Sequence, residues 1–206
     1  LKEAEGIEIQ NASLSKNNKE YFNFLYKKLR RKGFLERDCQ RLVNQDRNIF
    51  AACMVANGDA DGMITGSTRN YFVAYDDITR VIDPAPKSRI FGMSIIMVEG
   101  RTLFVADTTV HHLPSSEELA DIACQTAVIA KNLGYNPRVA MLSFANFGNP
   151  AIEGTERVHG AIEVLDSRKV DFEYDGEMTV DVALTPKSLA FYPFCRLSRP
   201  ANILIM

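Results

Sequence analysis

The sequence Gly58-Asp59-Ala60-Asp61-Gly62-Met63-Ile64-Thr65-Gly66-Ser67-Thr68-Arg69-Asn70-Tyr71 carries the pattern from which the fold class can be inferred. An apolar helix is expected over residues 49–56, followed by an acidic turn and a short apolar strand, Met63 to Thr65. Gly66-Ser67-Thr68 is then expected to open the next helix. A strand that passes through glycine and hydroxyl residues into a helix is typical of an anion-binding site, because the first turn of a helix has free N–H groups. We therefore predict an α/β protein with a ligand cleft at the carboxyl edge of a sheet.

Two short motifs suggest metal binding but fit other interpretations better. Asp59-Ala60-Asp61-Gly62 resembles the start of a calcium loop, yet no third acidic ligand or closing glutamate follows it. We interpret it as a turn whose carboxylates cap backbone N–H groups. His111-His112 has no cysteine or carboxylate partner at ligand spacing, which favours a loop before the next helix. We therefore predict no metal site in this chain.

Strands and helices alternate along the rest of the chain. Glu99-Gly100-Arg101 predicts a hairpin between strands over residues 90–98 and 102–106. Ser115 and Glu118 have capping-box spacing and predict a helix start. Asn149-Pro150 has the residue types of a helix cap and first helical residue. Further helices are expected over 16–32, 36–44, 47–57, 69–82, 181–184 and 186–191, and further strands over 7–9, 138–143, 171–174 and 203–206.

This order predicts an α/β fold class with mostly parallel sheets and one antiparallel hairpin. The 206 residues are 46% apolar and 24% charged, with a net charge of −2, so no basic field is available to recruit nucleic acid or a membrane surface. Apolar runs such as Ile95 to Val98 are too short to span a bilayer, and no secretory signal is visible. The four cysteines form no C-x-x-C pair. We therefore expect free thiols and a cytoplasmic location.

A second strand-to-helix junction runs from Ser143 to Pro150, and two such junctions in one α/β chain tend to face one crevice. Asp107, at the end of the strand after Arg101, either lines this cleft or caps the strand, and the residues leave both open. Asp175-Gly176-Glu177 forms a third, acidic junction. No catalytic triad order, Walker lysine or G-x-G-x-x-G motif occurs, so no catalytic residue is assigned. The candidate ligand-binding residues are Gly66, Ser67, Thr68, Arg69, Asn70, Ser143, Asn146, Gly148 and Asp175.

Five separated blocks resemble phosphate acetyltransferases, in the order of that family. They are Gly58–Met63, Val105–Thr108, Arg138–Ser143, Tyr174–Glu177 and Ala201–Ile205. Four further segments resemble one branch of the family, the phosphate acetyltransferase-like domain that follows the catalytic part of NADP-dependent malic enzymes. These segments are Thr68–Phe72, Val81–Pro84, Asp171–Tyr174 and Tyr192–Arg196.

The resemblance implies a two-lobed fold with isocitrate/isopropylmalate dehydrogenase-like architecture and a coenzyme A cleft between the lobes. It implies that residues 1–62 belong to the first lobe, that residues 63–206 form the second lobe and a strand returning toward the first, and that segments at both ends are missing. The family's acyl-transfer residues, a serine–arginine pair and an aspartate, would lie in the missing C-terminal segment. Active members carry other residues at Arg69-Asn70 and in the loop Ala145-Asn146-Phe147. They carry an arginine near Asp76, whose carboxylate would repel phosphates.

The resemblance implies an acetyl-CoA-sensing regulatory and oligomerisation domain of a malic enzyme, inactive as an acetyltransferase. The alternatives are an active phosphate acetyltransferase and an assembly domain without a ligand. No cofactor is expected in this chain, whereas the parent protein would use NADP with Mg or Mn. The expected partners are acetyl-CoA or a related CoA ester, the catalytic malic-enzyme domain of the same polypeptide, and further copies of the protein. Arg69 is expected to hold a phosphate of acetyl-CoA, or alternatively to pair with Asp59, Asp61 or Asp76.

Overall fold

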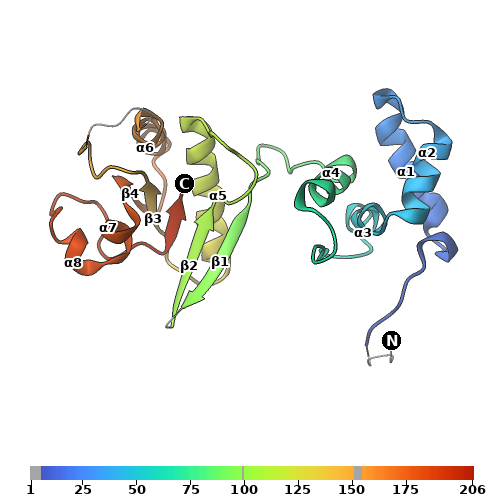
Figure 1. Cartoon of the computed structure of the whole chain (residues 1–206), viewed down its shortest axis with the longest axis horizontal. Helices are drawn as coiled ribbons and strands as arrows, with labels where there is room; N and C mark the ends of the chain where they lie inside the picture. The colour runs from blue at the N-terminus through green and yellow to red at the C-terminus, as the bar shows by residue number, and fades with distance from the viewer. Residues whose placement is uncertain (1–5, 99, 151–154) are drawn as a thin grey trace. The chain divides into compact units, whose positions relative to one another are not determined.

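The computed structural model describes residues 6–98, 100–150 and 155–206. The chain divides into two compact units, Leu1–Asp83 and Pro84–Met206, which run from blue to green and from green to red in Figure 1. Each unit has a hydrophobic core of its own. In the part of the chain that the structure describes, no helix is long and apolar enough to cross a membrane. The same residues contain no group of histidine, cysteine and acidic side chains arranged to hold a metal ion.

Unit 1 consists of helices packed on one another. The predicted helices are confirmed as α1 (Asn18–Leu29), α2 (Glu36–Gln45), α3 (Arg47–Ala56) and α4 (Tyr71–Val81), with 3-10 turns at Ala12–Leu14 and Arg30–Lys32. Apolar side chains recur on the inner faces of the helices, as amphipathic helices require. The buried core consists of Tyr21, Leu25, Leu29, Cys39, Val43, Ile49, Phe50, Ala52, Cys53 and Val81.

Two predicted strands of unit 1 are wrong. Residues 7–9 and 63–65 have no ladder partner, because residues 6–83 contain no strand with which they could pair. Ile64 is fully exposed to solvent as a result. The start of α4 also differs from the prediction. Asn70 accepts a hydrogen bond from the N–H of Phe72 through its side chain, so the helix begins at Tyr71 and Gly66-Ser67-Thr68 precedes it as a loop.

The boundary between the two units lies between Asp83 and Pro84. Met63 packs against the core of unit 1, and residues 63–83 belong to that unit. The final strand, Ile203–Ile205, belongs to unit 2. The assignment of lobes in a longer protein stays a prediction.

Unit 2 is built on a five-stranded sheet. The strands are β1 (Met93–Val98), β2 (Arg101–Ala106), β3 (Arg138–Leu142), β4 (Glu173–Met178) and β5 (Ile203–Ile205), in the order β1-β2-β5-β3-β4. Only the β1–β2 pair, the predicted hairpin, is antiparallel. The predicted fold class is therefore confirmed as α/β with a mostly parallel sheet and one antiparallel pair. The comparison with isocitrate dehydrogenase architecture stays a prediction.

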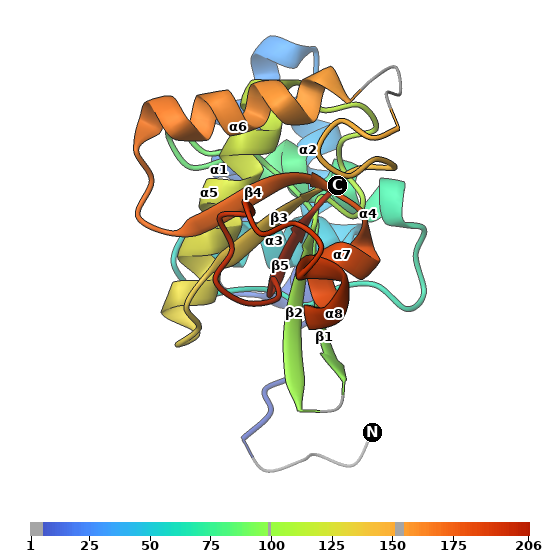
Figure 2. The same cartoon turned by 90° about the vertical axis from the view of Figure 1, so that its left-hand side faces the viewer.

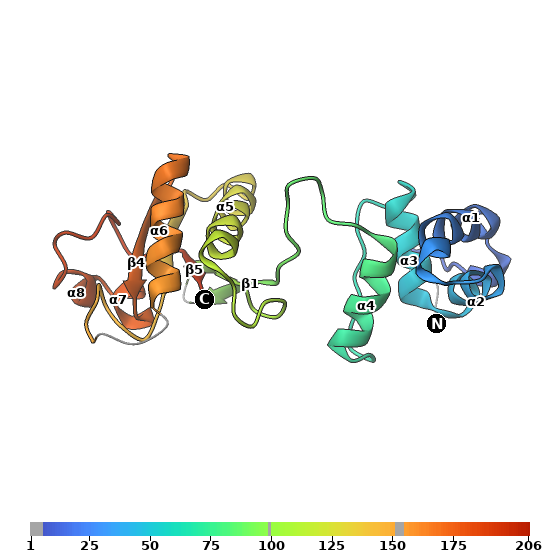
Figure 3. The same ribbon diagram turned by 90° about the horizontal axis from the view of Figure 1, so that it is seen from above.

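Helices cover both faces of this sheet. Figures 2 and 3 show α5 (Ser116–Asn132) and α6 (Glu156–Arg168) side by side on one face. The short helices α7 (Val180–Leu184) and α8 (Pro186–Leu189) belong to the opposite side. Successive strand residues point to opposite faces. Val139, Met141, Ile203 and Ile205 therefore join the core under α5 and α6, whereas Ala140 and Leu204 join the core beside α7.

Local signals in unit 2 are confirmed in part. Ser115 and Glu118 form the predicted capping box of α5. Asn149 does not cap α6, because Thr155 holds the N-cap position of that helix, and the backbone of Asn149 instead pairs in both directions with Asn146. Residues 151–154, like Glu99, lie outside the described residues, and α6 begins at Glu156. Asp175-Gly176-Glu177 lies within β4 instead of following it.

All four cysteines are free thiols, as predicted. Cys39 and Cys53 are buried in unit 1, while Cys124 and Cys195 are partly buried in unit 2. Burial disfavours the thiolate and raises the pKa of each thiol, to about 12 for Cys53 and about 11 for Cys195. The thiols are therefore poor nucleophiles in the folded chain.

Candidate functional site

A cavity of about 480 Å³ opens at the carboxyl edge of the sheet in unit 2. Asp107, Ser143 and Met206 follow strands β2, β3 and β5 directly and line it, as does Arg157 in the first turn of α6. This is the edge at which open parallel sheets bind their ligands. The remaining wall is largely apolar, formed by Leu119, Leu142, Phe144, Val158, Val180 and other side chains. We call this space the carboxyl-edge cavity.

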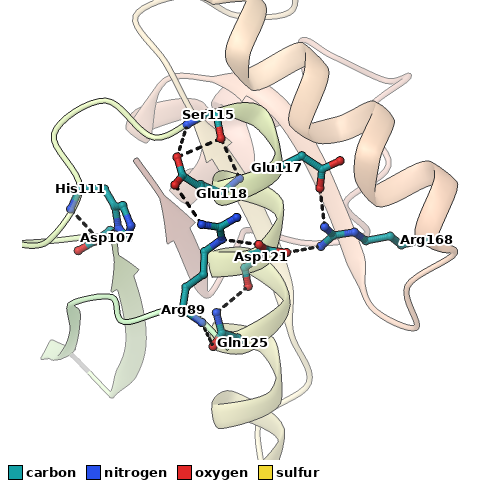
Figure 4. A network of polar contacts seen from close by, with 9 residues as sticks. All are labelled: Arg89, Asp107, His111, Ser115, Glu117, Glu118, Asp121, Gln125 and Arg168. Carbon is teal, nitrogen blue, oxygen red and sulfur yellow. Dashed lines mark hydrogen bonds and ion pairs between the residues drawn. The ribbon is translucent and has the colours of Figure 1, made fainter. Parts of the chain in front are cut away.

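One wall of the carboxyl-edge cavity is a loop organised by Asp107. The buried carboxylate accepts hydrogen bonds from the backbone N–H groups of Gly92, Thr109, Val110 and His111, at 2.9–3.0 Å. Its Oδ2 also lies 2.6 Å from Nδ1 of His111 (Figure 4). Burial by itself would raise the pKa of Asp107, but these donors outweigh burial and lower it. Both open readings of Asp107 therefore hold: it lines the cavity and it fixes the loop after the strand.

The start of α5 forms the next part of the wall and is braced from two sides. The Ser115 N–H donates to Glu118 at 2.9 Å, and the Glu118 N–H donates back to Ser115 Oγ at 3.3 Å. Arg89, ahead of β1, pairs with Glu118 and Asp121, while Arg168 of α6 pairs with Asp121 from the other side (Figure 4). The helix N-terminus beside the carboxyl-edge cavity is thus fixed before any ligand arrives.

Arg157 supplies a positive charge that no described carboxylate neutralises. Its Nη1 donates to the carbonyl oxygen of Pro114 at 3.1 Å, which orients the guanidinium toward the loop before α5. Among the described residues, no acidic side chain forms an ion pair with it. His111 and His112 line the same cavity. The cavity therefore combines an apolar wall with donors for an anionic group, an arrangement that suits an amphipathic anion.

The four predicted site residues of unit 2 do not all reach this cavity. Ser143 lines it, as the strand-end pattern predicted. Asn146 uses its Oδ1 to accept from the N–H and the hydroxyl of Thr179, at 2.8 and 3.0 Å. Asn146 therefore ties the loop after β3 to the residue after β4, and its side-chain oxygen is already occupied.

Gly148 and Asp175 are likewise engaged within the protein. The Gly148 N–H donates to Oε1 of the buried Glu177 at 3.0 Å. Asp175 accepts from the N–H of Gly176 and, at 2.7 Å, from the N–H of Arg196. These contacts hold the loops around β4 and do not place either residue among those that line the carboxyl-edge cavity.

The first predicted cluster belongs to unit 1 and shapes a smaller cavity of about 270 Å³. Gly66, Thr68 and Arg69 line it, together with Arg47 at the start of α3. Ser67 and Asn70 do not line it, and Asn70 instead caps α4. That this cluster and the junction after β3 face one crevice stays a prediction, because the two belong to different units.

Arg69 is held by two carboxylates of its own unit. Its Nη1 lies 2.6 Å from Oδ2 of Asp46 and 3.2 Å from Oδ2 of Asp77. The hydrogen bond and charge of Asp46 raise the pKa of Arg69. Burial would raise the pKa of Asp46, but the hydrogen bond from Arg69 and two backbone N–H groups lower it. The geometry favours the alternative in which Arg69 holds the loop, with Asp46 and Asp77 as its partners in place of Asp59, Asp61 or Asp76.

Replacing Arg69 with alanine is expected to destabilise unit 1 by about 2 kcal/mol, because two partly buried carboxylates lose their partner. Thermal unfolding measures this loss. The half-saturating concentration of any acetyl-CoA effect should stay where it was. A shifted midpoint with an unchanged melting temperature would instead place Arg69 on a ligand. Arg41→Ala removes an exposed arginine of α2 and serves as the matched control.

The chain matches known proteins along nearly its whole length. The family model described as "Phosphate acetyl/butaryl transferase" matches residues 2–206. The chain is 60% identical over 201 residues to an NADP-dependent malic enzyme of Rhizobium meliloti (strain 1021), covering 98% of this chain and 26% of that protein. A phosphate acetyltransferase of Clostridium acetobutylicum is 30% identical over 96% of the chain, which covers 62% of that relative. The chain therefore spans about a quarter of the first of these relatives and less than two thirds of the second.

Solved structures of the same class have the same fold. The EutD phosphotransacetylase from Staphylococcus aureus superposes with a TM-score of 0.81 at 25% identity, over 98% of this chain and 62% of that one. A phosphotransacetylase from Streptococcus pyogenes gives a TM-score of 0.82 at 26% identity, over 96% and 60% of the two chains. With its α/β sheet and a family model that matches residues 2–206, this chain belongs to the phosphate acetyl/butaryl transferase family.

Proposed function

We propose that this chain is the acetyl-CoA-sensing domain of an NADP-dependent malic enzyme and does not itself transfer acetyl groups. The carboxyl-edge cavity carries the proposal, because it joins an apolar wall to the guanidinium of Arg157, which forms no ion pair with any described carboxylate. An acyl-CoA thioester has the matching character, with an apolar acyl end on an anionic phosphate-bearing carrier. The identity of 60% to a protein named NADP-dependent malic enzyme supports the assignment of the parent.

In this proposal the ligand binds the carboxyl-edge cavity and changes the activity of a malic-enzyme domain elsewhere in the polypeptide. The parent would oxidatively decarboxylate malate to pyruvate in the cytoplasm, with NADP and Mg or Mn. It would assemble into a homo-oligomer through domains such as this one. Binding of acetyl-CoA and binding of malate would then be linked by a coupling free energy, which acts equally in both directions.

Titrating acetyl-CoA into the full-length protein while following malate-dependent NADP reduction tests the proposal. A saturable change of rate, together with direct acetyl-CoA binding in calorimetry, is the expected result. An assembly domain without a ligand would show neither response. Desulfo-CoA, which lacks the thiol on which the acyl group is carried, separates recognition of the thioester end from recognition of the phosphates.

The 206-residue chain is expected to show no phosphate acetyltransferase turnover. The resemblance to active phosphate acetyltransferases implies that the acyl-transfer residues lie outside this sequence. It also implies that Asp76 stands about where those enzymes have an arginine. The Asp76 carboxylate is largely exposed and pairs with Arg80 at 3.6 Å, so it adds a negative charge to the surface of α4. Release of CoA from acetyl-CoA and phosphate, followed by a thiol reagent, measures the activity. Turnover above a protein-free control would contradict this expectation.

A further inference from the structure

A second cavity of about 480 Å³ lies at the opposite, amino edge of the same sheet. Arg101 and Arg138, the first residues of β2 and β3, line it together with Arg199. Tyr135 and Asn202 also line this cavity. Because β2, β5 and β3 are parallel, their amino ends meet at this edge, away from the carboxyl-edge cavity. We call this space the arginine cavity.

The arginine cavity gathers positive charge that no described side chain neutralises. Among the described residues, no carboxylate lines it, and none forms an ion pair with Arg101, Arg138 or Arg199. In the same unit, by contrast, Arg89, Arg168 and other basic side chains are paired with acids. Guanidinium groups stay charged at every physiological pH, so three of them around one cavity repel one another until an anion enters. The chain as a whole is slightly acidic, which makes this concentration of charge local.

Both the backbone and the side chain of Arg138 are held by hydrogen bonds. Its N–H donates to Oδ1 of Asn202 at 2.8 Å, and its Nε donates to the carbonyl oxygen of Pro200 at 2.8 Å. Asn202 is buried and donates in turn to the carbonyl oxygen of Asn136 at 2.9 Å. The Nη2 amine of Arg138 donates to no group among the described residues, so it is an oriented donor without an acceptor. A preorganised donor binds an anion with little loss of conformational entropy.

We propose that the arginine cavity binds a small phosphate-bearing ligand with at least two negative charges. The planar guanidinium fork matches the oxygens of a phosphate group, and three forks exceed what one monocarboxylate can satisfy. The hydroxyls of Thr102 and Tyr135, 3.0 Å apart on the same rim, offer further donors to phosphate oxygens. The volume lies within the range of small-molecule sites. This site is separate from the carboxyl-edge cavity and does not depend on the function proposed for that cavity.

Calorimetric titration of the full-length protein with pyrophosphate, in metal-free buffer, tests the site. Arg101→Ala and Arg199→Ala are the informative variants, because neither side chain donates a hydrogen bond to any described residue and neither should be needed for folding. Each is expected to weaken pyrophosphate binding roughly tenfold, with a weaker salt dependence than wild type. Arg41→Ala, which removes an exposed arginine of α2 that pairs with no described residue, is the matched control and should bind as wild type does.

Three outcomes would overturn the inference. Equal pyrophosphate affinity in wild type, Arg101→Ala and Arg199→Ala would show that these arginines do not bind pyrophosphate. Tighter binding of malonate or citrate than of pyrophosphate, lost in the same variants, would make it a carboxylate site. A change of sedimentation coefficient in the double variant without a change in pyrophosphate affinity would assign the cluster to contact between copies. Arg157→Ala should leave pyrophosphate binding intact, so failure here is distinguishable from failure of the acetyl-CoA proposal.

Discussion

Replacing Asp107 with asparagine is expected to destabilise unit 2 by roughly 2–4 kcal/mol at pH 7, as a buried charge-assisted network is broken. Oδ1 of Asp107 accepts three backbone N–H groups, and Oδ2 accepts the N–H of His111 and faces its Nδ1. An asparagine can replace only one of these oxygens, because its amide nitrogen would point its own hydrogens at donors. Urea unfolding at pH 7 measures the loss.

The same variant also tests how the stability of unit 2 depends on pH, and the direction of this dependence follows from the pKa of Asp107. Because the folded pKa of Asp107 is lowered, its contribution to stability is complete above the ordinary carboxyl pKa of about 3.9 and is lost as the pH falls through the folded value. The stabilities of wild type and Asp107→Asn should therefore differ at pH 7 and begin to converge as the pH falls below about 4. Asp171→Asn, which alters an exposed carboxylate paired with Lys131, is the control and should unfold near the wild-type midpoint. An unchanged urea midpoint for Asp107→Asn would show that the Asp107 network contributes little to the stability of unit 2.

Replacing Arg157 with alanine is expected to raise the half-saturating concentration of acetyl-CoA roughly tenfold to a hundredfold in the full-length protein. This range corresponds to the loss of one charge-assisted contact worth about 1.5–3 kcal/mol. Arg157→Lys should give an intermediate value, because it keeps the charge and loses the planar fork. Acetyl-CoA binding followed by calorimetry gives the affinities directly.

The control for Arg157 must separate binding from folding. Thermal unfolding of each variant shows how much stability the hydrogen bond to Pro114 contributes, and Arg41→Ala accounts for the general loss of one positive charge. An acetyl-CoA affinity that is equal in wild type and Arg157→Ala would place the ligand elsewhere. Because the arginine cavity is tested with pyrophosphate on other variants, the two sites can fail independently.

Elements whose signals are local could be predicted from the sequence. The capping box of Ser115 and Glu118 lies within four residues, and the helical spacing of Tyr21, Leu25 and Leu29 needs no partner to be recognised. A strand, by contrast, forms only when a second strand pairs with it, and the local sequence does not show which segment that partner is. Residues 63–65 are apolar enough for a strand, but residues 6–83 contain no strand to pair with them. The same limit explains Asn149, which pairs with Asn146 in place of capping a helix.

The candidate site was predictable only where it follows a strand. Ser143 was found because a hydroxyl residue after a buried strand marks the carboxyl edge, and it lines the cavity there. Arg157 was missed, because its role comes from the packing of α6 beside the loop at Pro114. His111 carried a usable signal, since it lies four residues after Asp107 and its imidazole can return to that carboxylate. The partners of Arg69 were not predicted, because the packing of α3 on α4 brings Asp46 and Asp77 together beside it.

The four free thiols give the chain an unfolding reporter that requires no engineered label. In the folded state burial raises the pKa of each thiol, so a thiolate-selective alkylating reagent at mildly alkaline pH reacts slowly. Cys39 and Cys53 belong to one unit and Cys124 and Cys195 to the other, so mass spectrometry of the alkylated peptides distinguishes opening of one unit from opening of the other. Damage to the Asp107 network should thus appear first as modification of the second pair, while the first pair remains protected.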